Sequence, residues 1–185
     1  KKMNYRFKLL DKVYFQASQN PQRILLPEAD IDPRVFQAAI QLANDKICQV
    51  SVIGNTNSLL KKIKEENPQL VSQINIFDGD ANNQDLIKYA NQLYQKRKHK
   101  GMTQEEAYQL MQNVNYYACS LLNDNKVDGV ATGATFTTKE VFQPALKILG
   151  TKDQFHRVSS YFIMLVNEQE LFFADCAVNI NPNAR

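Results

Sequence analysis

Two short polar stretches of this 185-residue chain carry residue types that could bind or transform a small molecule. The first, residues 132–138, contains a glycine and four threonines where an apolar run ends and a helix should begin. Glycine allows close backbone approach, and the N–H groups and positive dipole end of a helix start favour an anion. The threonines could instead only cap the helix, so the sequence leaves both interpretations open. The candidates in this stretch are Thr132, Gly133, Ala134, Thr135, Thr137 and Thr138.

The second stretch, residues 171–179, alternates in a way that predicts a β-strand. The alternation places Asp175 and Asn179 on one face of an otherwise apolar run, where polar groups without partners would be costly. Cys176 falls on the opposite, apolar face, which favours a buried thiol and makes Asp175 the better candidate. Cys176 and the nearby Asn181 are kept as substrate-binding candidates, and we expect both polar stretches to converge on one small-molecule site.

Two smaller groups of polar residues are further candidates. Arg157, Ser159 and Ser160 stand at the start of a predicted strand, where such residues often only satisfy backbone groups. Arg97 and Lys100 belong to a basic run at the end of a predicted helix. The favoured interpretation is that these cations complement the helix dipole and stay solvated; the alternative is that they hold ligand phosphates, for which the planar guanidinium of Arg97 is the best donor.

The composition, with 44% hydrophobic and 22% charged residues, is that of an ordinary globular protein. A net charge of +3 is too small to indicate a nucleic acid or a membrane surface as partner, and no apolar run approaches the roughly 20 residues that span a bilayer. Three separated cysteines and two histidines predict neither a disulfide framework nor a metal site. We expect a cytoplasmic protein, and the two chain ends suggest a fragment.

The apolar pattern predicts an α/β fold. Four short apolar runs between residues 23 and 131 alternate with segments of helical periodicity. This indicates a mostly parallel sheet with helices on both faces, a three-layer α/β/α arrangement. Capping boxes formed by Thr103 with Glu106, and by Thr137 with Glu140, mark two helix starts.

The pattern changes near residue 156. Two apolar runs joined by a short polar turn predict a β-hairpin in place of another crossover. We therefore expect an N-terminal α/β domain over residues 1–154, which could be incomplete. Residues 155–185 would form the truncated start of a second α/β domain.

Together these motifs resemble those of the phosphate acetyl/butyryl transferase family. The run 173–179 with the Asn-Pro that follows looks like the family signature, and other motifs appear in the family's order from residue 23 onward. The basic run and the Phe-Ala-Asp-Cys run resemble the acetyl branch. The resemblance rests on Leu26, Pro27, Glu28, Asp32, Pro33, Arg34, Arg97, Lys98, His99, Lys100, Gly101, Met102, Thr103, Glu105, Glu106, Ala107, Asp128, Gly129, Gly133, Ala134, Thr135, Thr137, Thr138, Pro144, Ala145, Leu146, Val158, Ser159, Ser160, Phe173, Ala174, Asp175, Cys176, Ala177, Val178, Asn179, Asn181 and Pro182.

The resemblance implies reversible transfer of an acetyl group between coenzyme A and inorganic phosphate, which gives acetyl phosphate. It also implies a two-domain homodimer with its site between the domains, and no metal or organic prosthetic group, coenzyme A being a substrate. In the implied mechanism a base takes the thiol proton and the thiolate attacks the acetyl carbonyl. Arginines and N–H groups hold the phosphate and the developing oxyanion, and Arg157 could add one such contact.

The chain departs from the family pattern at several positions. The family's general base would lie beyond Arg185. Gln143 stands where the family usually has arginine, Phe136 replaces a frequent histidine, and Ile180 replaces the first proline of an Asn-Pro-Asn-Pro pattern. Two alternatives stay open: a non-catalytic module that binds coenzyme A or a partner chain, and a phosphate butyryltransferase.

Overall fold

The computed structural model describes residues 7–151, 158–167, 169–176 and 178. The chain divides into two compact units. The larger unit is Asn20–Gly150, and the smaller one combines the segments Lys1–Gln19 and Thr151–Arg185. The domain boundary expected near residue 154 stays a prediction.

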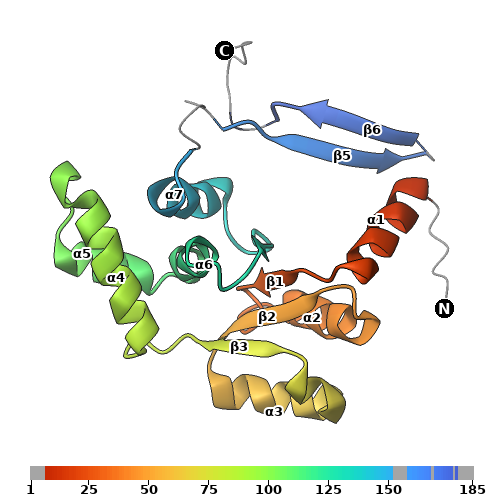
Figure 1. Cartoon of the computed structure of the whole chain (residues 1–185), viewed down its shortest axis with the longest axis horizontal. Helices are drawn as coiled ribbons and strands as arrows, with labels where there is room; N and C mark the ends of the chain where they lie inside the picture. The colour runs from red at the N-terminus through yellow and green to blue at the C-terminus, as the bar shows by residue number, and fades with distance from the viewer. Residues whose placement is uncertain (1–6, 152–157, 168, 177, 179–185) are drawn as a thin grey trace. The chain divides into compact units, whose positions relative to one another are not determined.

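A four-stranded parallel sheet forms the centre of the larger unit (Figure 1). Its strands are β1 (Arg23–Leu26), β2 (Gln49–Gly54), β3 (Asn75–Asp78) and β4 (Gly129–Val130), in the order β3-β2-β1-β4. β4 pairs with β1 only through Ile24 opposite Gly129 and Leu25 opposite Val130. The prediction of a mostly parallel α/β sheet is confirmed, although β4 is shorter than its apolar run indicated.

Helices cover both faces of this sheet. One face carries α2 (Pro33–Asp45), α3 (Thr56–Glu66) and the 3-10 helix η1 (Pro68–Ser72). The other carries α4 (Gln84–Arg97), α5 (Gln104–Met111), α6 (Val114–Asn123) and α7 (Thr138–Ile148). Because successive strand residues point to opposite faces, Leu25 and Leu26 of β1 belong to two different hydrophobic cores. This is the expected three-layer arrangement.

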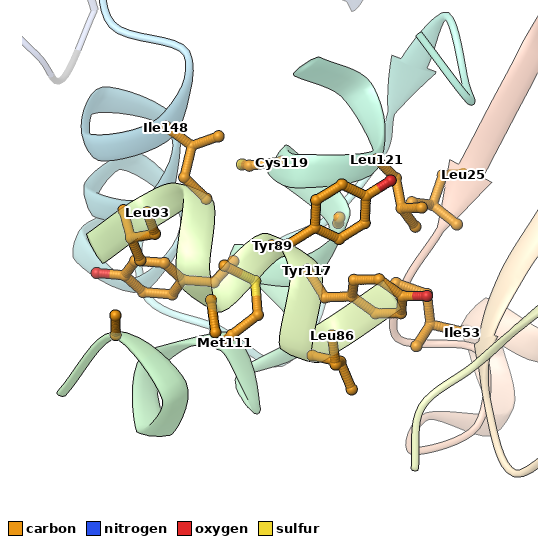
Figure 2. Packing of buried hydrophobic residues seen from close by; sticks show 14 of the residues in the cluster. Leu25, Ile53, Leu86, Tyr89, Leu93, Met111, Tyr117, Cys119, Leu121 and Ile148 are labelled. Carbon is orange, nitrogen blue, oxygen red and sulfur yellow. The ribbon is translucent and has the colours of Figure 1, made fainter. Parts of the chain in front are cut away.

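The larger core lies between the sheet and α4 to α7 (Figure 2). Tyr89 of α4 and Tyr117 of α6 are both 2% exposed, and their ring centroids lie 6.0 Å apart in a tilted arrangement. The Tyr89 hydroxyl donates to Asp124 just past the end of α6 at 2.8 Å. Such aromatic pairs bury large apolar areas, so they fix the helices that lead the chain to β4.

The helix ends follow the sequence signals. Both predicted capping boxes are present, at the starts of α5 and α7. α4 continues into the 3-10 helix η2 (Lys98–Lys100), which ends at Gly101 with a left-handed φ of 85°. That conformation suits glycine because it has no Cβ.

The connections create a crevice at one edge of the sheet. From β1 the chain winds through α2, β2, α3 and β3 in one direction, and it later returns to place β4 on the other side of β1. The segments that follow β1 and β4 therefore lead to opposite faces of the sheet. In open α/β sheets this point of divergence, at the carboxyl ends of the strands, is where ligands bind.

The smaller unit contains the hairpin. β5 (Tyr161–Val166) and β6 (Gln169–Ala174) pair antiparallel, as predicted. The N-terminal helix α1 (Lys8–Gln19) belongs to this unit, and the Leu9 N–H donates to Glu170 Oε1 at 2.7 Å. The prediction of one strand over residues 171–179 was wrong, because β6 ends at Ala174. Asp175 adopts a left-handed φ of 54°, which a strand cannot continue.

Candidate active site at the carboxyl ends of β1 and β4

Three carboxylates at alternate positions follow β1, and each binds a different part of the larger unit. They are Glu28, Asp30 and Asp32. Glu28 contacts the segment after β4, Asp30 the start of α3, and Asp32 the start of α2. The segment after β1 thus connects the loops at this edge of the sheet.

Glu28 holds the loop between β4 and α7 through N–H groups and hydroxyls. The N–H groups of Gly133 and Ala134 donate to Oε1 at 2.6 and 3.1 Å. The N–H and hydroxyl of Thr135 donate to Oε2 at 2.6 and 2.5 Å, and the Thr132 hydroxyl lies 2.9 Å from Oε1. The carboxylate is 0% exposed. An internal carboxylate therefore occupies the anion-binding groups that the sequence predicted here.

The surroundings of Glu28 favour its ionised form. Burial alone raises the pKa of this carboxyl. Hydrogen bonds from the Thr135 and Thr132 hydroxyls and from the N–H groups of Gly133 and Thr135 outweigh burial and lower the pKa to about 2. Glu28 consequently carries its charge at neutral pH.

Asp30 connects β1 to the start of α3. It accepts the Asn55 N–H at 3.1 Å and the Lys62 ammonium at 2.9 Å. Its side chain lies against Gly54, where an added Cβ would come within 2.5 Å of the Asp30 Cβ. Glycine is therefore the residue that lets the carboxylate approach the backbone at the end of β2.

Asp32 caps α2 and orients Arg34. Its carboxylate accepts the Arg34 N–H at 2.8 Å and the guanidinium Nη2 at 2.6 Å. The side-chain hydrogen bond from Arg34 is the main reason that the pKa of Asp32 falls to about 2, and burial opposes it. Nη2 also lies 3.4 Å from the Ala134 carbonyl oxygen, so the exposed Arg34 reaches the loop that Glu28 holds.

A hollow of about 350 Å³ opens between these two segments. Its walls combine apolar side chains with the polar groups just described, and they lie at the crevice between β1 and β4. A mostly apolar hollow with a few placed polar groups is the usual form of a small-molecule site. The lining residues are Leu26, Glu28, Arg34, Val35, Ala38, Ala131, Thr132 and Ala134.

The basic run at the end of α4 contacts the C-terminal end of α7. The Arg97 guanidinium donates to the carbonyl oxygens of Leu146 at 3.0 Å and Lys147 at 2.9 and 3.2 Å. The Lys96 ammonium donates to the Ile148 carbonyl. These cations bind carbonyls that have no partner inside their own helix.

A second hollow, of about 670 Å³, lies beside this contact. Three basic side chains line it, together with residues of α5 and of the link between η2 and α5. The Lys147 ammonium lies 5.6 Å from the ring centroid of Tyr116, and this cation–π contact orients the Lys147 side chain. The lining residues are Arg97, Lys100, Gly101, Met102, Glu106, Gln109, Leu110 and Lys147.

The candidates of the smaller unit cluster at one end of the hairpin. The Ser159 hydroxyl donates to Asp175 Oδ1 at 2.8 Å, and the Asp175 N–H donates to the Ser160 carbonyl at 2.7 Å. The Ser160 hydroxyl donates to the Cys176 carbonyl. Arg157, Asn179 and Asn181 lie outside the described residues. Convergence of this cluster with the loop at 132–138 stays a prediction.

Sequence reasoning did not assign Glu28, Asp30 and Arg34 to the site. An acid directly after the buried run of β1 was the available signal, since strand ends are where such sheets place their polar groups.

Within the described ranges, no group of three or more His, Cys, Asp and Glu side chains could hold a metal ion. None of the described helices is long and apolar enough to cross a membrane.

Comparison with known proteins identifies the family. Residues 8–185 match the sequence model described as phosphate acetyl/butaryl transferase. The chain belongs to this family. Phosphate acetyltransferase from Clostridium acetobutylicum is 32% identical over 182 residues, covering 95% of this chain and 54% of that protein. The Bacillus subtilis phosphate acetyltransferase is 33% identical over 179 residues, 96% of this chain and 54% of its own length.

A solved structure of the same family supports the fold. A phosphotransacetylase from Streptococcus pyogenes superposes with a TM-score of 0.82 at 27% identity, covering 97% of this chain and 54% of that one. This chain therefore spans about half the length of the family members it matches. The resemblance seen in the motifs is confirmed.

Proposed function

We propose that this chain is part of a phosphate acetyltransferase, which reversibly transfers an acetyl group between coenzyme A and inorganic phosphate. The family match across residues 8–185, with phosphate acetyltransferases as relatives, is the observation that carries the proposal. The substrates are then acetyl-CoA, phosphate and acetyl phosphate. The complete enzyme is proposed to be a cytoplasmic homodimer that needs no metal and no organic prosthetic group.

The hollow between β1 and β4 is the proposed place of the phosphate or acetyl phosphate. Arg34 supplies a guanidinium at its rim, and the exposed Thr138 begins the neighbouring helix. Val35 and Ala38 offer apolar surface to the acetyl methyl group.

The larger hollow is the proposed place of the nucleotide part of coenzyme A. Lys100 and Lys147 offer ammonium groups to its phosphates, while Met102 and Leu110 offer apolar surface to its base. Arg97, predicted as a phosphate contact, donates to the end of α7, so its first proposed role is to fix the wall that carries Lys147. A phosphate contact by the remaining N–H groups of Arg97 is proposed as its second role.

The hairpin end is proposed to face the same substrates in the complete enzyme. Ser159, Ser160, Asp175 and Cys176 already form one hydrogen-bonded cluster. Arg157, Asn179 and Asn181 would add polar groups beside it. The general base is proposed to lie in the part of the family's length that this chain does not span, so the residues described here are proposed as binding groups.

Calorimetric titration with coenzyme A tests the binding half of the proposal. Lys100→Met and Lys147→Met should each weaken binding by about 5- to 30-fold, the effect of one lost charge-assisted contact. Dephospho-CoA, which lacks one phosphate, should bind more weakly to the wild type and lose less on mutation. Lys61→Met is the matched control, since Lys61 is an exposed lysine of α3 whose ion pair is with Glu65.

The outcomes separate the alternatives. Failure of the wild-type chain to bind coenzyme A would contradict the proposal, as would an equal loss in the Lys61→Met control. Binding without acetyl transfer by a chain of full family length would favour the non-catalytic module. Preference for butyryl phosphate over acetyl phosphate would favour the butyryl branch.

A further inference from the structure

Glu28 already fills the place that an anionic ligand would take at the loop after β4. Three consecutive N–H groups, from Gly133 to Thr135, point at its two oxygens at 2.6, 3.1 and 2.6 Å. The Thr135 hydroxyl adds a bond at 2.5 Å, and the Thr132 hydroxyl lies at 2.9 Å. Successive N–H groups arranged in this way form an anion-binding concavity. Here the anion is part of the chain.

A second anion cannot share these donors with the carboxylate. Glu28 is ionised and 0% exposed, and each of the three N–H groups is already committed to one of its oxygens. A phosphate at the same N–H groups would have to lie beside the carboxylate, where like charges at close range repel strongly. Phosphate binding at these amides would thus require Glu28 to leave.

The loop also depends on Glu28 for its position. β4 has only two residues. Just past it, the Ala131 N–H donates to the Leu25 carbonyl at 2.9 Å, and among the described backbone hydrogen bonds this is the last one to β1. From Thr132 to Thr135 the chain is bonded to the Glu28 carboxylate and no longer to the sheet. The capping box of Thr137 and Glu140 then starts α7. Two carboxylates therefore make most of the contacts that position the chain between β4 and α7, and Asn115 at Thr132 and Arg34 at Ala134 add one contact each.

We propose that Glu28 is the positioning residue of this loop and the resident anion of the Gly133, Ala134 and Thr135 amides. A phosphate-bearing substrate is then contacted by side chains around the hollow, Arg34 first, and not by these three amides. This consequence for the substrate rests on the proposed function. The role of Glu28 in positioning the loop is independent of the proposed function, so experiment can refute either one without the other.

Amide hydrogen exchange and chemical shifts, measured by NMR on the whole chain, test the proposal. In the wild type, the amides of Gly133, Ala134 and Thr135 should exchange slowly. In Glu28→Gln they should exchange at least about 100-fold faster, while core amides such as that of Val52 keep their protection. Asp30→Asn is the matched control from the same segment, and it should alter the Asn55 amide and leave residues 133–135 protected.

Titration with inorganic phosphate supplies the second arm and uses the wild type alone, so it holds even if a variant fails to fold. The three amide resonances should not move up to millimolar phosphate, whereas resonances around Arg34 should shift if the proposed substrate site is correct. Saturable shifts of the three wild-type amides would overturn the proposal. Protection in Glu28→Gln within about 3-fold of the wild type would overturn it as well. Absence of shifts around Arg34 would count against the proposed function only.

Discussion

Replacing Arg97 with methionine should loosen the C-terminal end of α7. The guanidinium donates three hydrogen bonds to the carbonyls of Leu146 and Lys147, at 2.9 to 3.2 Å. Those carbonyls have no partner within α7, because the last turn of a helix leaves its acceptors unpaired. Methionine keeps most of the apolar stem, so the substitution removes mainly the charge and the donors.

The structure sets the size of the effect. A hydrogen bond to a charged group contributes about 1.5–3 kcal/mol in favourable cases, and a cation at a helix C-terminus about 0.3–1 kcal/mol. Arg97 is only partly buried, so water screens its charge and replaces some of the lost bonds. We expect a loss of about 1–2 kcal/mol in the free energy of unfolding. At a slope of about 2 kcal/mol per molar urea, the midpoint would fall by about 0.5–1 M.

Urea unfolding followed by far-ultraviolet circular dichroism measures this loss. Lys98→Met is the matched control, since Lys98 belongs to the same basic run but, within the described part of the chain, donates to Gln95, one turn away. Its unfolding free energy should stay within about 0.5 kcal/mol of the wild type. Equal stability of the two variants would refute the anchoring role of Arg97. A loss of coenzyme A affinity without a loss of stability would then identify Arg97 as a ligand contact.

Three further predictions concern the carboxylates and the hairpin. Because the folded-state pKa of Glu28, about 2, lies below the ordinary 4.5, its stabilising effect is complete above about pH 4.5 and is lost as pH falls toward 2. The urea midpoints of wild type and Glu28→Gln should therefore converge on acidification, and a constant difference would contradict this. Gly54→Ala should cost about 1–3 kcal/mol, because its Cβ would lie 2.5 Å from that of Asp30; an unchanged melting temperature would refute the close contact. The exposed apolar side chains of the hairpin, among them Phe172 at 66% exposure, should make this chain self-associate, and Phe172→Lys should reduce the association. A monodisperse wild-type monomer in light scattering would count against it.

Much of the larger unit could be predicted from local signals. The apolar runs that became β1, β2 and β3 are bounded by polar residues, and the helices between them begin at recognisable caps such as Asp32 before Pro33. Both capping boxes formed where the Thr-x-x-Glu spacing placed them. Parallel pairing followed from the alternation of strand and helix, because such connections require crossovers.

The strand predicted over residues 171–179 shows where periodicity fails. Its alternation continues through Asp175 in the sequence, yet β6 ends at Ala174. Asp175 takes a left-handed conformation, and its N–H and carboxylate bond to Ser160 and Ser159 across the hairpin. Side chains of Asp that bond to the backbone or to nearby hydroxyls compete with strand geometry, and alternation alone does not reveal the competition.

The role of Glu28 could not be predicted because its partners are distant in sequence. The Gly133 and Thr135 N–H groups lie 105 and 107 positions along the chain. The sequence indicated that the loop at 132–138 would attract an anion, but only the arrangement of β1 beside β4 determines which anion reaches it. In the same way, the two hollows arise from the packing of separate elements and have no local signature.

Acetyl transfer from acetyl phosphate to coenzyme A, measured as the rate of thioester formation, is the most direct test of the proposed activity. The 185-residue chain should be compared with a chain extended by a C-terminal half of this family to the length of the members it matches. We expect the extended chain to form acetyl-CoA and this chain alone to form none, because the proposed general base lies outside these 185 residues. An extended chain that folds and binds coenzyme A but forms no acetyl-CoA would contradict the proposed activity. Turnover by the 185 residues alone would contradict the placement of the base, and would make Asp175 and Cys176 the first residues to replace.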